Sequence, residues 1–197
     1  HPIPRRQRQM CIRDRPGALL SDQASLEIET CEQLGEMLGA LDQALLTFED
    51  PRARRPIKWD LLRSEWIGAQ LERVEAGWLR DAVEAIHEWH LAHQGALAEL
   101  RRCVVHNDAN DHNLLVAEEG PQRVTGLIDF GDMCETAMVS ELAIAASYAA
   151  MHASDPLAAI DAVTRGYHAA LPLLPNELAM VVPVSYTHLR AHETPCH

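Results

Sequence analysis

The segment from Val104 to Val116, VVHNDANDHNLLV, places histidine, asparagine and aspartate residues between two short apolar runs. A second polar group, GLIDFGD, contains Asp129. Asn113 and Asp129 lie the same number of residues before and after Pro121, and two strands joined at Pro121 would bring them together. Amide and carboxylate oxygens suit Mg²⁺ and the phosphates that it carries. With Asp108 on the entering loop, the pattern predicts a phosphoryl-transfer site.

A β-hairpin is predicted to position these residues. Leu114–Val116 and the VTGLIDF run at residues 124–130 are short and apolar, which is typical of strands. The AEEGPQR stretch between them contains Gly120 and Pro121, which favour a turn. The hairpin would therefore place its two polar ends at one edge of a small sheet.

Calcium binding is an alternative interpretation of the same residues. Four of them occupy ligand offsets of a calcium-binding loop: Asp108, Asn110, His112 and Glu119. However, His112 is a poor calcium ligand, and Asn113 stands where such a loop requires glycine.

A metallohydrolase is a second alternative, and ordinary turn chemistry is a third. A transition metal could be bound by His106, Asp108, His112 and Asp129. This set of ligands would explain why histidines occur here. It would not explain why Asn113 and Asp129 lie the same number of residues before and after Pro121. Asp and Asn also occur in turns simply because they bond to nearby backbone groups.

The remainder of the chain is predicted to be helical. Leucines three and four residues apart form one apolar stripe in the first helix, and Asp155 with Pro156 is typical of a helix start. In the second helix, the expected inward residues are Val74, Trp78, Ile86 and Trp89. Five helices are expected, over residues 21–48, 71–100, 140–151, 154–171 and 173–182.

HNDANDHNLLV followed by GLIDFGD resembles the catalytic segment of the aminoglycoside phosphotransferase and choline kinase-like superfamily, which is related to the H-R-D-x-x-x-x-N and D-F-G motifs of protein kinases. Together with ELAIA, the segment is most similar to hydroxylysine kinase-like phosphotransferases, including those fused to class III aminotransferases. The resemblance implies a mostly helical α+β fold, a protein kinase-like C-terminal lobe over residues 16–183. The hairpin would carry its catalytic and metal residues. A fusion to an aminotransferase in the parent protein is compatible with it.

The resemblance also implies roles for individual residues. Asp108 would be the catalytic carboxylate that takes the proton of the acceptor hydroxyl. His106 would support the catalytic loop. Asn113 and Asp129 would bind Mg²⁺ and, through it, the nucleotide.

Weaker assignments follow for neighbouring residues. Asp132 would assist the metal or cap the following segment. Glu141, in SELAIA, resembles the helix carboxylate that holds the catalytic loop. Asp111 and His112 are candidates to face a substrate amine.

The implied function is that of a small-molecule kinase fragment. It would transfer the γ-phosphate of ATP or GTP to a hydroxyl of a small amine or amino acid, with Mg²⁺ as cofactor. Upstream of Asp108 there is no G-x-G-x-x-G and no lysine other than Lys58, so the N-terminal lobe is expected to be missing. A non-catalytic fragment is therefore an alternative to an active enzyme.

The two ends of the chain lack apolar periodicity. Residues 1–15 and 184–197 resemble translated sequencing-adapter peptides, and we expect both to be non-native tails.

The composition of the chain limits the classes of molecule that it is expected to bind. Lys and Arg total 17 against 29 for Asp and Glu, a net charge of −12 that disfavours nucleic acids and anionic membranes. The same charge is compatible with a cationic acceptor. No apolar run approaches the roughly 18 residues needed to span a bilayer. The scattered cysteines form no C-x-x-C pair, so we expect a cytoplasmic protein.

Overall fold

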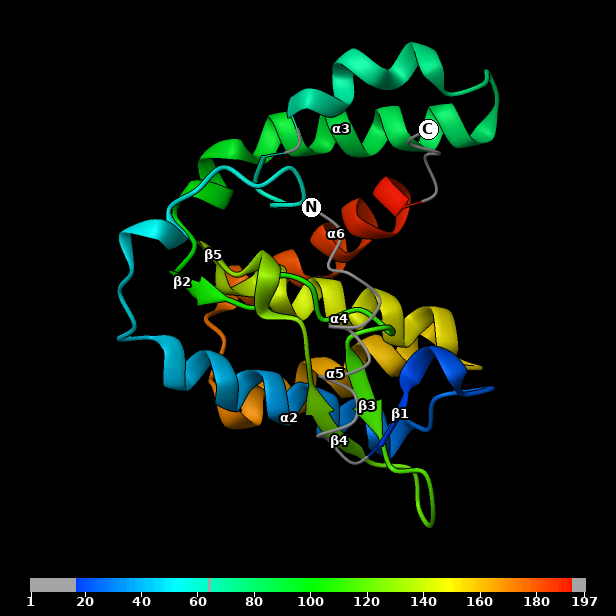
Figure 1. The fold of residues 1–197 in the computed structure, drawn as a ribbon. Coiled ribbons are helices and arrows are strands. Elements are labelled where there is room, and N and C mark those ends of the chain that lie inside the picture. Colours follow the sequence, from blue (N-terminus) through cyan, green and yellow to red (C-terminus); the bar gives the residue numbers. More distant parts are fainter. Residues whose placement is uncertain (1–16, 64, 193–197) are drawn as a thin grey trace.

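The computed structural model describes residues 17–63 and 65–192. Within them, a helical layer carries two small antiparallel sheets (Figure 1). One sheet has the strand order β1-β3-β4 and the other pairs β2 with β5. The strands are β1 (Ala18–Leu19), β2 (Arg102–Val105), β3 (Leu114–Val116), β4 (Val124–Leu127) and β5 (Cys134–Ala137).

The helices include long α-helices and short 3₁₀ segments. The α-helices are α2 (Ile28–Leu45), α3 (Trp78–Ala98), α4 (Met138–His152), α5 (Pro156–Ala170) and α6 (Pro175–His192). The 3₁₀ segments are η1 (Leu20–Asp22), η2 (Pro51–Ala53), η3 (Glu65–Arg73) and η4 (Phe130–Asp132). The mostly helical α+β fold predicted from the sequence is thus the observed one.

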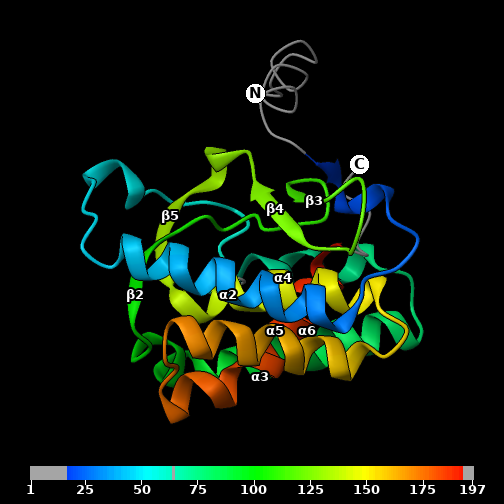
Figure 2. The same ribbon diagram turned by 90° about the horizontal axis from the view of Figure 1, so that it is seen from below.

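Helix α4 forms the centre of the core. Every residue from Met138 to Ala150 is buried, as its small apolar sequence predicts. Helices α2, α5 and α6 pack against it, and Figure 2 shows the strands on the opposite side of α2 from α5. The core therefore lies within the helical layer and includes buried residues of the strands that carry the polar loops.

Helices α2 and α5 approach each other through glycines. A side-chain carbon on Gly35 would overlap the carbonyl oxygen of Val163, and one on Gly166 would overlap that of Glu32. The two backbones can lie this close only because both positions lack a Cβ.

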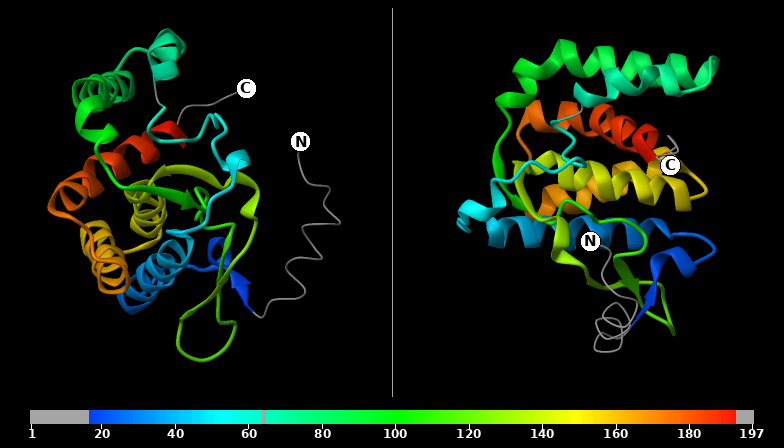
Figure 3. Two further views of the ribbon diagram at one scale, coloured as in Figure 1. Left: turned by 90° about the vertical axis from the view of Figure 1, so that its left-hand side faces the viewer. Right: turned by 45° about the horizontal axis from the view of Figure 1, so that its top comes forward.

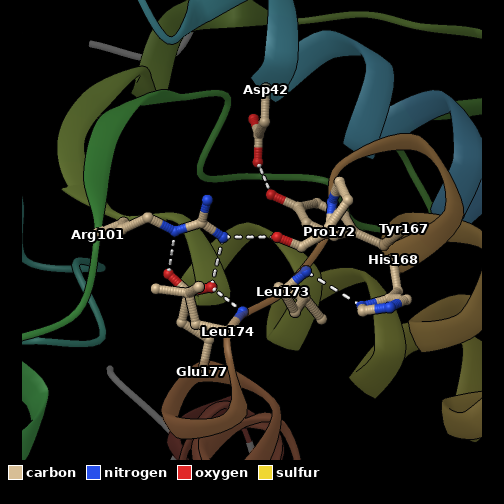
Figure 4. Close-up of polar contacts among 8 residues, drawn as sticks. All are labelled: Asp42, Arg101, Tyr167, His168, Pro172, Leu173, Leu174 and Glu177. Atoms are coloured by element: carbon tan, nitrogen blue, oxygen red, sulfur yellow. Dashed lines mark hydrogen bonds and ion pairs between the residues drawn. The ribbon is translucent and has the colours of Figure 1, made fainter.

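A polar network ties the start of β2 to the turn between α5 and α6 (Figure 4). Arg101 donates from Nε and Nη2 to the two carboxylate oxygens of Glu177, at 2.7 and 2.6 Å. Glu177 also accepts from the backbone N–H of Leu174 at 2.8 Å. Nearby, the hydroxyl of Tyr167 donates to the buried carboxylate of Asp42 at 2.5 Å. These contacts fix α5 and α6 against the strand that leads to the site.

The first helix begins later than predicted, at Ile28 rather than near residue 21. The side chain of Gln122, in the hairpin turn, accepts from the N–H of Glu27 and donates to the carbonyl of Ser25, at 2.8 and 2.9 Å. Residues before α2 are thereby held extended against the hairpin, and η1 takes up part of the remaining stretch.

The second helix also differs from the prediction. Its pattern is interrupted at Gly77, where φ is 144°, so η3 and α3 are separate elements. Trp78, expected to point inward, is 70% exposed. The buried residues of α3 are instead Val83, His90 and Leu97, which are seven residues apart and lie along one side of the helix.

Helix α6 extends beyond residue 183, the boundary at which a non-native tail was expected. Val184 and Ser185 are buried, and the Ser185 carbonyl accepts from the hydroxyl of Ser147 on α4 at 2.9 Å. The predicted N-terminal tail, residues 1–15, lies outside the described residues. Within the described part of the chain, no helix combines the length and apolar character required to cross a membrane.

Candidate functional site

The predicted hairpin forms and brings its two polar ends together. Leu114 pairs with Leu127, and the N–H of Ile128 donates to the carbonyl of Asn113 at 2.9 Å. Asn113 therefore lies across the sheet from the residue that precedes Asp129. The predicted pairing of the two strands is observed, but its register differs by one residue from the equal spacing around Pro121, and there is an irregularity between Leu115 and Val116.

Asp108 is held by two asparagine amides. Asn113 donates from Nδ2 to Oδ2 of Asp108 at 2.7 Å, and Asn110 donates to Oδ1 at 2.7 Å. Burial raises the pKa of Asp108 to about 6; the two amide hydrogen bonds oppose this shift, and the charges of Asp132 and Asp129 add to it. The site thus holds an oriented carboxylate close to other acids.

His106 links the loop that carries Asp108 to the end of β4. It is fully buried, its Nε2 lies 3.1 Å from the carbonyl of Ile128, and its Nδ1 accepts from the N–H of Asp108 at 3.3 Å. The ring of Phe130 packs edge-on against it, with centroids 4.8 Å apart. Burial lowers the pKa of His106, which favours the neutral form. Because both ring nitrogens are engaged, the metallohydrolase interpretation does not fit.

Two non-glycine residues at the site have left-handed backbones. Asn107 has φ of 63° and Asp129 has φ of 64°, in the region that Asn and Asp tolerate best among side-chain-bearing residues. The carboxylate of Asp129 accepts from the N–H of Gly131 at 3.3 Å, which supports this local turn. Such conformations concentrate at functional sites, where surrounding contacts maintain them.

Glu141 reaches the loop from inside the core. Its Oε2 accepts from the backbone N–H of Asn107 at 2.6 Å, and the side chain is fully buried on α4. Burial raises the pKa of Glu141 to about 7, the Asn107 hydrogen bond opposes this, and the charge of Asp108 adds to it. The carboxylate lies directly behind the loop that carries Asp108.

The calcium interpretation does not fit the geometry. Asp108 and Asn110 hydrogen-bond to each other, and β3 begins directly after Asn113, so Glu119 lies beyond the far end of the strand. His112 is 72% exposed at its side chain. These residues do not surround a common point.

Asp111, a candidate to face the substrate amine, has a different partner. Its carboxylate lies 3.0 Å from Nε2 of His152 at the end of α4, and its carbonyl accepts from the N–H of Ser21 at 3.0 Å. Asp111 therefore joins the loop to α4 and η1.

The oxygen donors at the hairpin end are compatible with Mg²⁺. Asn113 directs its amide nitrogen at Asp108, so its oxygen is the atom suited to ligate a metal. Among residues 17–63 and 65–192, no three His, Cys, Asp or Glu side chains form a metal site of their own. Mg²⁺ commonly takes one or two carboxylates and completes its shell with phosphates and water. The donors fit a metal that arrives with a nucleotide.

The basic, proline-flanked connector, residues 51–60, contacts η4 and the residue after it, and this contact was not predicted from the sequence. Arg55 donates to the carbonyl oxygens of Gly131 and Met133, the latter at 3.3 Å, and Arg54 pairs with Glu135 at 2.7 Å. The sequence of this segment does not indicate which carbonyl groups Arg55 binds, because those groups belong to residues far away in the chain.

A model of the phosphotransferase enzyme family APH matches residues 11–177. The chain belongs to this family. Hydroxylysine kinase of Danio rerio is 29% identical over 147 residues, which cover 71% of this chain and 41% of the relative. Hydroxylysine kinase of Mus musculus is 28% identical over 152 residues, 72% of this chain and 40% of the relative. The family member described here thus spans about 40% of the length of these curated relatives.

Solved structures show the same fold. An amicoumacin kinase in complex with AMP-PNP, Ca²⁺ and Ami superimposes with a TM-score of 0.58 at 16% identity, over 90% of this chain and 53% of that one. A GDP complex of aminoglycoside 2′-phosphotransferase-IIIa gives 0.55 at 18% identity, over 84% and 58%. The recognition of the family from its sequence motifs is confirmed.

Proposed function

We propose that the protein containing this chain transfers the γ-phosphoryl group of ATP or GTP to a hydroxyl of a small amine or amino acid. Membership of the APH phosphotransferase family supports the reaction class. The observation that carries the site assignment is the position of Asp108, whose two carboxylate oxygens are each oriented by an asparagine amide beside Asp129.

Asp108 acts as the base in this proposal. The acceptor oxygen forms a bond to the γ-phosphorus, the bond to the bridging oxygen of the nucleoside diphosphate breaks, and Asp108 accepts the hydroxyl proton. Its pKa of about 6 leaves the carboxylate largely ionised at neutral pH and more basic than an exposed aspartate.

Asn113 and Asp129 are the residues that would hold Mg²⁺, with Asp132 as a weaker candidate. When bound, the metal would neutralise charge on the phosphates. Asn113 also orients Asp108, so it would serve both the metal site and the base. His106 and Glu141 hold the loop backbone from the hairpin and from α4 respectively.

The test measures nucleotide consumption by the full-length protein over a panel of hydroxylated amines and amino acids. Asp108→Asn keeps the shape of the side chain but removes the base, so we expect kcat to fall by about 10²- to 10⁴-fold. Asp161→Asn, the same change on an exposed position of α5, is the control. Undiminished turnover in the Asp108 variant would contradict the assignment.

A further inference from the structure

The turn that follows Asp129 receives little support from the core. None of the three residues of η4 is buried, and Phe130 is 48% exposed although its ring packs on His106. Segments with few buried contacts open locally at low free-energy cost. Asp129 also has a left-handed backbone, a conformation that persists only where surrounding contacts maintain it. The position of the Asp129 carboxylate therefore depends on polar contacts around η4.

Gly131, in the middle of η4, is held from two sides. Its N–H donates to Oδ1 of Asp129 at 3.3 Å, and its carbonyl oxygen accepts from Nη2 of Arg55. The same nitrogen donates to the carbonyl of Met133 at 3.3 Å, so it bridges the backbone before and after Asp132. Because one residue binds both Arg55 and the Asp129 carboxylate, a change at Arg55 is passed on to Asp129.

The connector that carries Arg55 is itself anchored on β5. In Figure 3 the connector, in cyan, lies beside the yellow-green segment that leads into β5. Asp60 accepts from the hydroxyl of Thr136 at 2.7 Å, and both of these side chains are buried. Arg54 pairs with Glu135 at 2.7 Å. Arg55 therefore extends from a backbone that is fixed on both sides, and it can hold η4 in one place.

The contact of Arg55 is local in its effect. Arg55 is exposed, so its hydrogen bonds add little to the stability of the whole protein. In a segment without buried residues, however, the same bonds make up a large share of what keeps the backbone ordered. Loss of Arg55 should thus loosen η4 without unfolding the chain.

We propose that Arg55 is a positioning residue for Asp129. It acts through the backbone of Gly131 and fixes the direction of the Asp129 carboxylate before any metal is bound. A carboxylate that is already in place loses less conformational freedom on binding a metal, so the affinity for Mg²⁺ is higher. This inference rests on the proposed function, because Asp129 is a metal ligand only in that proposal.

Amide exchange in the metal-free chain tests the structural step. The N–H of Gly131 donates to Asp129, so its exchange with water, measured by NMR, reports on that contact. We expect Arg55→Met to speed this exchange about 2- to 10-fold, the effect of losing about one hydrogen bond. Arg54→Met removes the same charge at the neighbouring position, which pairs with Glu135, and should leave the rate unchanged. An unchanged rate in Arg55→Met, or equal acceleration by both variants, would overturn the proposal.

A conservative variant separates the donor from the rest of the side chain. A single nitrogen of Arg55 makes both contacts, so the ammonium of Arg55→Lys, which has three donors, can replace it. Arg55→Lys should therefore keep the slow exchange of the Gly131 amide, whereas Arg55→Met, with a stem but no donor, should lose it. Equally fast exchange in the lysine and methionine variants would count against a donor role and overturn the proposal.

Nucleotide binding by the full-length protein tests the metal step. The probe is Mg²⁺ at fixed nucleotide, and Arg55→Met should raise the Mg²⁺ concentration for half-maximal nucleotide binding about 2- to 10-fold. If Arg55 acts through Asp129, then Arg55→Met should add nothing in an Asp129→Asn background. Additive effects of the two substitutions would show that Arg55 acts by another route, and would overturn the proposal.

The two readouts separate this inference from the proposed function. Faster Gly131 exchange in Arg55→Met, in a protein that transfers no phosphoryl group, would support the positioning of Asp129 and count against the kinase. Phosphoryl transfer with an unchanged exchange rate and an unchanged Mg²⁺ requirement in Arg55→Met would support the kinase and overturn the positioning role.

Discussion

The carboxylate of Glu141 accepts a 2.6 Å hydrogen bond from the backbone N–H of Asn107, the residue that precedes Asp108. A side chain of the central helix thus holds the left-handed turn of the loop that carries Asp108. That carboxylate is fully buried, so its ionised form is energetically unfavourable. The conformation of the loop at Asn107 is therefore linked to the protonation state of Glu141.

Glu141 should make stability depend on pH. Its pKa is about 7 in the folded protein against 4.5 as reference, so the folded state binds more protons between these values. The free energy of unfolding should therefore fall as pH rises from 4.5 to 7, by about 3 kcal/mol from this group. Glu141→Gln removes the titration. Urea unfolding of both proteins at pH 5 and 8 measures the difference, and parallel pH profiles would contradict it.

The pair of Tyr167 and Asp42 should be strongly coupled. Tyr167→Phe leaves the buried Asp42 carboxylate without its 2.5 Å donor and should cost about 1–3 kcal/mol of stability. Asp42→Asn removes a buried acid whose pKa is raised, chiefly by burial and also by the charge of Glu141. The double variant should lose less than the sum of the single losses, which denaturant unfolding of all four proteins measures. Additive losses would show that the two residues act independently.

A glycine at the contact of α2 with α5 and a glycine in an exposed helix should respond in opposite ways to replacement by alanine. Gly166→Ala would place a methyl group against the Glu32 carbonyl, a backbone atom, and should destabilise the protein by about 3 kcal/mol or more. Gly95→Ala, in the exposed part of α3 where the new carbon would meet no other part of the protein within 4 Å, should stabilise it by up to about 1 kcal/mol. Thermal unfolding of the two variants checks the sign of each effect. Similar Tm values would contradict the packing argument.

The two acidic metal candidates should differ in their contribution. Asp129→Asn keeps a residue that tolerates positive φ and can still accept from Gly131, so it removes mainly the charge. We expect the Mg²⁺ concentration for half-maximal nucleotide binding to rise about tenfold or more. Asp132→Asn should have a smaller effect. Titration of the full-length protein with Mg²⁺ at fixed nucleotide gives the ranking, and a larger effect at Asp132 would reverse the assignment.

The hairpin and the buried helix were predictable because their signals are local. Leu114–Val116 is a short apolar run with a turn behind it, and residues 140–151 are small and apolar on most faces, so period and composition alone identify them. Counting residues to the turn placed Asn113 opposite Asp129, and the observed partner is the neighbouring Ile128. The motif around Asp108 was equally readable, since its residue types and spacing lie within one segment.

Other features depend on distant partners and left no local signal. The late start of α2 is imposed by Gln122, more than ninety residues away in the chain. Strand β1, with only two residues, exists because β3 offers an edge for it. Trp78 is exposed because Gly77 separates η3 from α3, which changes the side of the helix that faces the core. The contact of Arg55 with η4 likewise joins segments that sequence spacing does not relate.

Arg55 has an evolutionary consequence. It binds the carbonyl oxygens on either side of Asp132, so a mutation that reshapes the connector also shifts the backbone next to Asp129. Substitutions at Arg55 and substitutions around Gly131 are therefore expected to occur together among related proteins.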